Sequence, residues 1–300
     1  MSVQPSHDHR KGIALTAAGG LLLTFDTPLL RLVDGDTWTV MFWRGLLMFA
    51  ILALFWLWMR LARGSKLPLV NGPAGFAVGL LYGAANVFFV MSLHLTTVAN
   101  LVFVLALTPM AAAALSRIFL GERISRPPLL AMVCAMGGVA LIVRGGIAHA
   151  TVLGDLLAAA TTLCLAGALT ITRSTGRDMS LTPGIGGLVA AIVSLALADS
   201  LALGAHPGGV MAVNAILVLP LSSALLALGP RYIPAAEVAM FYLLETVLAP
   251  IWVWLAVGEE ATASSLAGGA IIIVTLAVHS LWRLTRGRSS LPPVTPKAHP

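Results

Sequence analysis

Long apolar runs dominate the chain, and short polar segments separate them. The runs cover residues 13–30, 38–59, 73–93, 97–119, 128–147, 152–172, 182–200, 210–228, 234–257 and 264–284. Each run is close to the ~20 residues that a helix needs to cross the hydrocarbon core of a bilayer. The pattern therefore predicts an all-α membrane protein with ten transmembrane helices.

The overall composition supports a lipid environment. Hydrophobic residues make up 58% of the chain and charged residues only 10%, with a mean hydropathy of +0.94. A soluble domain carries about a quarter charged residues, so the surplus apolar area must face lipid. The net charge of +6 does not indicate a nucleic-acid partner, because the basic residues occupy short gaps between apolar runs and form no patch.

The positions of the basic residues test the number of spans. With a cytoplasmic amino terminus and ten spans, Arg31 and Arg144 fall outside and Arg44 lies within a span. Every other Lys and Arg then falls on the inner side, as the positive-inside rule requires. We therefore expect both termini to be cytoplasmic.

An internal repeat divides the chain into two related halves. One offset aligns residues 93–143 with 230–280 and places Gly121-Glu122 on Gly258-Glu259. The expected organisation is an amino-terminal cytoplasmic tail (1–12), a first five-span repeat (13–147), a second repeat (152–285) and a disordered cytoplasmic tail (286–300).

An odd number of spans in each repeat places the second repeat upside down relative to the first. Inverted repeats around a site at the membrane midplane are typical of secondary transporters that work by alternating access. A channel could share this symmetry.

The most distinctive positions of the first half are Arg44, 97–100, Pro109, 120–123 and Gly137-Gly138, and those of the second half are 235–237, Gly258-Glu259 and Gly268-Gly269. Through these positions the chain resembles the drug/metabolite transporter superfamily, in particular its ten-helix EamA branch, over nearly its whole length. The second half departs from the pattern, because Thr246 occupies the position equivalent to Pro109 and is flanked by Glu245 and Pro250. Subfamily and substrate are therefore left open.

The resemblance implies a secondary-active carrier in a bacterial-type cytoplasmic (inner) membrane. Many members of the family export amino acids, including aromatic ones, and other small metabolites. We expect export of amino acids, with uptake or exchange of another small solute (a nucleobase, an organic acid or a drug-like compound) as the alternative.

Ionisable residues inside apolar runs are candidates for function, because each costs ~2.5–3.5 kcal/mol to insert. Asp26 lies four residues before the outer end of the first span, and Arg44 lies six residues into the second. At about 1.5 Å per residue the two share a depth, so we expect an ion pair. It could form an outer gate, bind a zwitterionic solute, or only lock the two spans together.

The ninth predicted span carries two carboxylates. Glu245 lies near its middle, three residues after Tyr242, and Glu237 lies one turn inside the cytoplasmic end. Helical spacing keeps Glu237 and Glu245 within about 80° of each other, which predicts that both face a polar cavity. Their role could be amine recognition or proton coupling, since desolvation favours the protonated form of a carboxyl group. A structural hydrogen bond to a neighbouring helix is the alternative.

Aromatic and amide side chains could line the same cavity. Tyr82 and Asn86 lie one turn apart in the third span, Trp43 precedes Arg44, and Asn100 begins the fourth span. Such a mixed lining suits an amphipathic small solute, although an aromatic stripe is more often packing than pocket.

Other repeated features of the two halves have architectural interpretations. Glu122 and Glu259 each follow a glycine (Gly121, Gly258) that ends a helix, and each could accept from the free N–H groups of the next helix. The pairs Gly137-Gly138 and Gly268-Gly269 let helices approach closely, within a monomer or in a homodimer.

The sequence contains no motif of an intramembrane enzyme or of an ATP-driven transporter. The chain has neither HExxH nor GxSxG, which argues against an intramembrane enzyme, and no GxxxxGK[ST], which argues against ATP drive. Cys134 and Cys164 lie in apolar runs and predict buried apolar side chains. We expect no metal and no cofactor.

Overall fold

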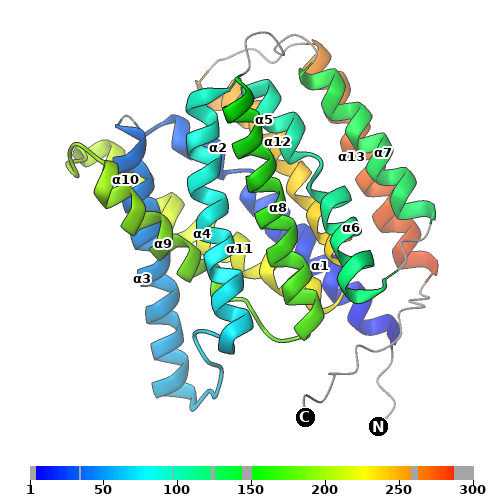
Figure 1. The fold of residues 1–300 in the computed structure, drawn as a ribbon, viewed down its shortest axis with the longest axis horizontal. Coiled ribbons are helices and arrows are strands. Elements are labelled where there is room, and N and C mark those ends of the chain that lie inside the picture. The colour runs from blue at the N-terminus through cyan, green and yellow to red at the C-terminus, as the bar shows by residue number, and fades with distance from the viewer. Residues whose placement is uncertain are drawn as a thin grey trace.

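The computed structural model describes residues 5–33, 35–96, 98–122, 126–143, 151–257 and 263–286. Within these ranges every regular element is helical, which confirms the predicted all-α class (Figure 1). The elements are α1 (Pro5–Leu23), α2 (Asp26–Arg31), α3 (Thr37–Arg63), α4 (Gly72–Leu95), α5 (Val98–Leu105), α6 (Thr108–Leu120), α7 (Arg126–Val143), α8 (Val152–Thr175), α9 (Thr182–Leu197), α10 (Ala205–Val213), the π-helix η1 (Asn214–Val218), α11 (Leu219–Leu228), the 3-10 helix η2 (Gly229–Arg231), α12 (Ala235–Val257) and α13 (Ala263–Arg286).

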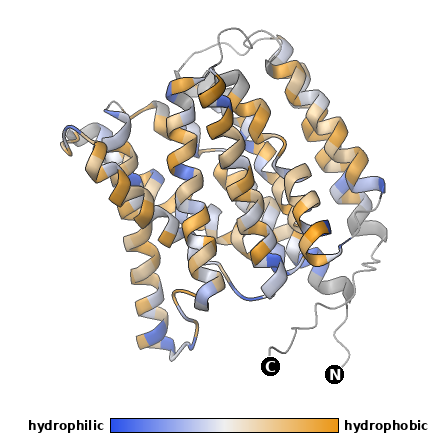
Figure 2. Cartoon of the chain, in the orientation of Figure 1, coloured by the Kyte–Doolittle hydropathy of each residue, from blue (hydrophilic) through white to orange (hydrophobic). Residues whose placement is uncertain are grey.

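Most of these helices have the length and composition of membrane spans. Six stretches in the described residues are long and apolar enough to cross a bilayer, and three shorter apolar helices accompany them. Apolar residues run along the whole length of the helices (Figure 2). Large side chains such as Leu61, Leu130 and Leu281 are exposed on the bundle surface, which only a lipid environment tolerates on this scale. The protein is a multi-pass membrane protein.

Local chemistry fixes the ends of the long helices. Asp36 precedes α3, and its carboxylate accepts hydrogen bonds from the backbone N–H groups of Trp38 and Thr39. At the other end, Gly64 closes α3 in the left-handed conformation, with φ of 61°. These caps hold α3 as one continuous helix and so fix the position of Arg44 along it.

The helices pack mainly between the two halves of the chain. α3 lies against α9, α4 against α8 and α9, α1 against α11 and α12, and α7 against α13 (Figure 1). α12 also contacts α6 and α8. Its residues Val238, Ala239 and Met240 are almost completely buried, so α12 is a central helix that presents Tyr242 and Glu245 to its neighbours.

Glycine contacts allow α7 and α13 to approach backbone to backbone. A methyl group added at Gly138 of α7 would collide with the carbonyl of Gly268 of α13, and one added at Gly268 would collide with the carbonyl of Gly138. Gly137 has open space around it. The expected close approach is confirmed for Gly138 and Gly268, and here it occurs within one chain.

The first predicted span is not one continuous helix. α1 already begins at Pro5 and ends at Leu23, and α2 starts at Asp26. The break at Thr24 and Phe25 is held by Trp252 of α12, whose ring stacks on Phe25 with centroids 5.0 Å apart. The indole N–H of Trp252 donates to Thr24 Oγ1 at 3.0 Å. Tertiary contacts therefore stabilise an interruption that the uniform hydropathy of the segment hides.

Two other predicted spans are also irregular. The fourth divides into α5 and α6, and Pro109 lies in the first turn of α6, where its missing N–H costs no helical bond. The eighth contains the π-helix η1, which begins at Asn214. Such segments recur at functional sites because they redirect side chains and free backbone groups.

Candidate functional site

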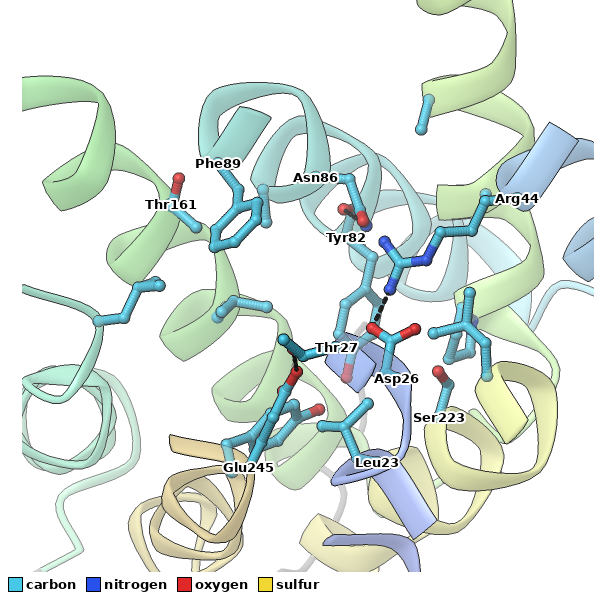
Figure 3. Close-up of a pocket in the computed structure, with 18 of the residues that line it drawn as sticks. Leu23, Asp26, Thr27, Arg44, Tyr82, Asn86, Phe89, Thr161, Ser223 and Glu245 are labelled. Atoms are coloured by element: carbon cyan, nitrogen blue, oxygen red, sulfur yellow. Dashed lines mark hydrogen bonds and ion pairs between the residues drawn. The ribbon is translucent and has the colours of Figure 1, made fainter. Parts of the chain in front are cut away.

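A polar cavity of about 270 Å³ lies among the helices of both halves (Figure 3). Its walls come from α2, α3 and α4, from the break between α5 and α6, and from α8, α9, α11 and α12. Leucine, alanine, methionine and phenylalanine make up much of the lining. Charged, amide, hydroxyl and phenol groups supply most of the rest, and this combination of an apolar wall with placed polar groups is typical of a site for a small molecule.

Asp26 and Arg44 form an ion pair in this cavity, as predicted (Figure 3). The guanidinium of Arg44 donates to Asp26 Oδ2, and Asn214 donates to Asp26 Oδ1 at 2.7 Å. Only 7% of the Asp26 side chain and 17% of the Arg44 side chain are exposed. Two neighbouring helices and the π-helix therefore hold one largely desolvated charge pair.

Asn214 was not among the residues predicted for the site. It is fully buried at the start of η1. Its Oδ1 and the Nε of Arg44 have no hydrogen-bond partner among the described residues. A buried amide in an otherwise apolar run (210–228) was the sequence signal that could have identified it, because such a group needs a polar partner.

Glu245 of α12 faces the same cavity. Thr27, the residue after Asp26, donates its hydroxyl to Glu245 Oε1 at 2.8 Å (Figure 3). In the described part of the chain no other group donates to this carboxylate. Glu245 therefore lies beside the Asp26–Arg44 pair, linked to it through two consecutive residues of α2.

The predicted aromatic and amide lining is partly present. Tyr82, Asn86 and Tyr242 all line the cavity, with Tyr82 and Asn86 on α4 and Tyr242 on α12 (Figure 3). The Asn86 amide donates to the Tyr82 backbone carbonyl at 2.8 Å. The Tyr82 hydroxyl is buried and interacts with the Tyr242 hydroxyl of α12. The two phenols therefore form a polar pair in the wall.

Trp43 does not line the cavity, contrary to the prediction. Its indole N–H donates to the Leu201 carbonyl at 2.8 Å, and its ring packs in a cluster with Val33 and Met211. Consecutive helical residues point about 100° apart. Since Arg44 faces the cavity, Trp43 is turned toward the segment before α10.

Glu237 was also placed wrongly in the cavity. It is 3% exposed and faces His279 of α13, with Oε2 and Nε2 3.9 Å apart. Eight residues separate Glu237 from Glu245, which leaves about 80° between them. That rotation, with two turns of rise, is enough to direct Glu237 to the α12–α13 interface. His279 thus contacts α12 from α13.

Glu122 has a partner that the sequence did not reveal. Gly121 closes α6 in the left-handed conformation (φ 68°), and Glu122 then accepts from Arg173 Nε at 2.9 Å. Arg173 also donates to the Pro230 carbonyl at 3.4 Å. The expected bonds from the first turn of the next helix, α7, are not found among the described residues, and Pro127 and Pro128 in that turn have no N–H to donate.

Several other predicted positions also lie outside the described part of the chain. Gly258, Glu259 and the side chain of Asn100 are among them. In the described residues, no group of three or more His, Cys, Asp and Glu side chains could hold a metal ion. Cys134 is exposed on the surface of α7, so the prediction that it is buried was wrong, and Cys164 is partly buried.

The fold and the cavity define a class: a multi-pass helical membrane protein that surrounds a small polar cavity, as carriers of small solutes do. Residues 10–144 match the model of the EamA-like transporter family. These residues, a little under half of the chain, therefore carry an EamA-like transporter domain of the drug/metabolite transporter superfamily, and this match favours a membrane transporter of small solutes.

Solved structures support the same fold. The crystal structure of a protein with 18% sequence identity superposes with a TM-score of 0.76, covering 91% of this chain and 98% of the other. At that identity the likeness concerns the fold alone. A comparison with curated proteins finds no significant match.

Proposed function

We propose that the protein is a secondary-active carrier that exports small organic metabolites by alternating access. It works in a bacterial-type inner membrane, with ten spans arranged as two inverted five-helix repeats and both termini cytoplasmic. Amino acids, including aromatic and hydrophobic ones, are the first candidates. The alternative is uptake or exchange of a nucleobase, an organic acid or a drug-like compound.

Helix packing supports the inverted repeat. In this scheme α1 and α2 correspond to α8, α3 to α9, α4 to α10–α11, α5 and α6 to α12, and α7 to α13. The contact of α1 with α11 then corresponds to that of α8 with α4, and α1–α12 corresponds to α8–α6. The contacts α3–α9, α6–α12 and α7–α13 join helices to their own counterparts. If the two repeats exchanged conformations, equivalent helices would therefore remain in contact, as this mechanism of alternating access requires.

The observation that carries the proposal is the cavity that contains Asp26, Arg44 and Glu245. Both halves of the chain contribute to it. Ionisable groups inside a membrane cost free energy to insert, so their presence in the cavity favours a role in transport. In the proposed mechanism Arg44, Tyr82, Asn86, Tyr242 and Glu245 contact the solute. Asp26 and Arg44 also form the outer gate, and Glu245 is the candidate for proton coupling.

A transport assay in proteoliposomes tests this function. Purified protein is reconstituted and screened for counterflow of labelled amino acids, nucleobases and organic acids. We expect Arg44→Ala and Glu245→Gln to reduce transport of the identified solute by at least about tenfold, because each removes a charge-assisted contact. Asp199→Asn, which removes an exposed carboxylate outside the cavity, is the control. Wild-type rates for both cavity variants would contradict the site assignment.

A further inference from the structure

The cavity contains more negative than positive charge. Among the described residues, its charged lining groups are Asp26, Arg44 and Glu245. Each carboxylate oxygen of Asp26 accepts a hydrogen bond, Oδ2 from Arg44 and Oδ1 from Asn214. The Asp26 charge therefore offsets the Arg44 charge. Glu245 has no counter-charge of its own.

The bonds to Glu245 do not compensate its charge. Oε1 accepts from the neutral hydroxyl of Thr27 at 2.8 Å, and no described residue donates to Oε2. Glu245 is partly buried, and a carboxylate that is partly withdrawn from water gains from a cation or from several hydrogen bonds, because a buried charge without compensation is unfavourable. The site is thus one positive charge short of neutrality, and a proton or a cationic group can supply that charge.

The groups around Glu245 suit an ammonium group. An ammonium has three donors and no acceptor, and the Tyr82 hydroxyl, which interacts with the Tyr242 hydroxyl, has a second lone pair that can accept in the same wall. The rings of Tyr82, Tyr242 and Phe89 line the same cavity and present aromatic faces that attract cations. The remaining lining is largely aliphatic, so it suits an apolar or aromatic body on the solute.

Arg44 is a poorer anchor for a carboxylate than its charge suggests. Its Nε has no acceptor among the described residues, so a solute oxygen could bond there. A carboxylate solute would nevertheless add a third negative charge to a cavity with one guanidinium. A zwitterion leaves the deficit unchanged, and only a net cation removes it.

On this basis, and resting on the proposed carrier function, we propose that the cavity selects small amines with one net positive charge and an apolar or aromatic body. A proton competes with the amine for Glu245. The titratable or charged groups that face Glu245 in the cavity are Asp26 and Arg44, which neutralise each other, and the phenols Tyr82 and Tyr242. None of the four supplies the missing positive charge.

Three probes with the same phenyl group test the proposal: phenethylamine (cation), phenylalanine (zwitterion) and phenylpropionate (anion). Equilibrium binding of each labelled probe to the full-length detergent-purified protein is measured at several pH values. We expect the amine to bind at least about tenfold more tightly than phenylalanine, and phenylpropionate to bind least, because a charge-assisted bond to Glu245 is worth that factor. Amine affinity falls as the pH is lowered, since protons occupy Glu245.

Two substitutions at Glu245 complete the test. Glu245→Gln lowers amine affinity by at least about tenfold and removes its pH dependence, whereas Glu245→Asp keeps the preference for the amine. Asp199→Asn, with the same change in net charge on an exposed loop, retains wild-type binding. The wild-type probe series and Glu245→Asp decide the question even if Glu245→Gln fails to fold.

The outcomes separate this inference from the proposed function. If wild-type protein binds phenylalanine or phenylpropionate as tightly as the amine, or if Glu245→Gln leaves the order of affinities unchanged, cation selection is wrong and the carrier stands. If the reconstituted protein moves none of the screened solutes and none of the three probes, the proposed function itself fails.

Discussion

Asn214 and Thr27 turn separate charged residues into one connected site. Asn214 reaches Asp26 from the start of the π-helix, and Thr27 reaches Glu245 from the turn that follows Asp26. α2 is therefore bonded to both η1 and α12. Because each bond involves a charged acceptor, it is stronger than a neutral hydrogen bond and fixes the orientation of the carboxylate.

The coupling between Asp26 and Arg44 can be measured directly. Asp26→Asn leaves the Arg44 charge largely buried without a counter-charge, so we expect it to lower the unfolding free energy by roughly 3–5 kcal/mol. Arg44→Gln does the same to Asp26, but the double variant should cost much less than the sum. Equilibrium unfolding of the purified variants in one detergent provides the cycle. Strictly additive effects would mean that the two charges do not stabilise each other.

Two interrupted elements meet at the cavity. Leu23 and Asp26, on either side of the break between α1 and α2, line it, and so do Ala106 and Thr108 at the break between α5 and α6. Helix ends leave backbone N–H and C=O groups unbonded, and a membrane protein tolerates this only next to protein or a water-filled cavity. At these two breaks the N–H groups of Thr24, Phe25, Ala106 and Leu107 bond to carbonyls of the preceding turn. The contribution of the breaks to the cavity is therefore the direction of the side chains that line it.

Hydropathy predicted where helices occur but not where they are interrupted. The break between α5 and α6 had a signal in Pro109, and the break at Thr24 and Phe25 had one in Pro28, which has no N–H to bond the Thr24 carbonyl four residues earlier. The contact of Phe25 with Trp252 of the distant α12 had no such signal. Helical spacing likewise located Glu237 and Glu245 along one helix. It could not say which neighbour each faces, because that depends on how α12, α13 and the cavity are packed.

The adjacent glycines of α7 provide a matched test of helix packing. Gly138→Ala forces its methyl group onto the Gly268 backbone, so we expect it to destabilise the protein by about 1–3 kcal/mol, as overpacking does. Gly137→Ala enters open space and should be neutral or stabilising by up to about 1 kcal/mol, because alanine favours a helix. Thermal unfolding in the same detergent compares them. Equal effects would show that α7 and α13 are not in close contact.

At the scale of the whole molecule, a second buried ion pair joins the halves away from the cavity. Glu122 follows α6 in the first half, and Arg173 near the end of α8 reaches both Glu122 and the Pro230 carbonyl before α12. Only 8% of the Arg173 side chain and 14% of the Glu122 side chain are exposed. None of the three residues lines the cavity. In the proposed topology they lie on the cytoplasmic side, where this contact joins the two halves.

If the halves exchange access, this contact must open whenever the cavity faces the cytoplasm. Arg173→Gln removes the charge that holds it closed, so we expect the population of the inward-open state to rise. Ser116 on α6 is buried about two turns before Glu122, and Ser116→Cys reports the opening once Cys134 and Cys164 are replaced by serine. A membrane-impermeant thiol reagent applied from the cytoplasmic side should modify the cysteine at position 116 several-fold faster in the Arg173→Gln background.

Arg177→Gln, at an exposed position beyond the end of α8, is the control and should leave the modification rate unchanged. An unchanged rate with Arg173→Gln would mean that the Glu122–Arg173 pair only supports the fold, and that the cytoplasmic barrier lies elsewhere.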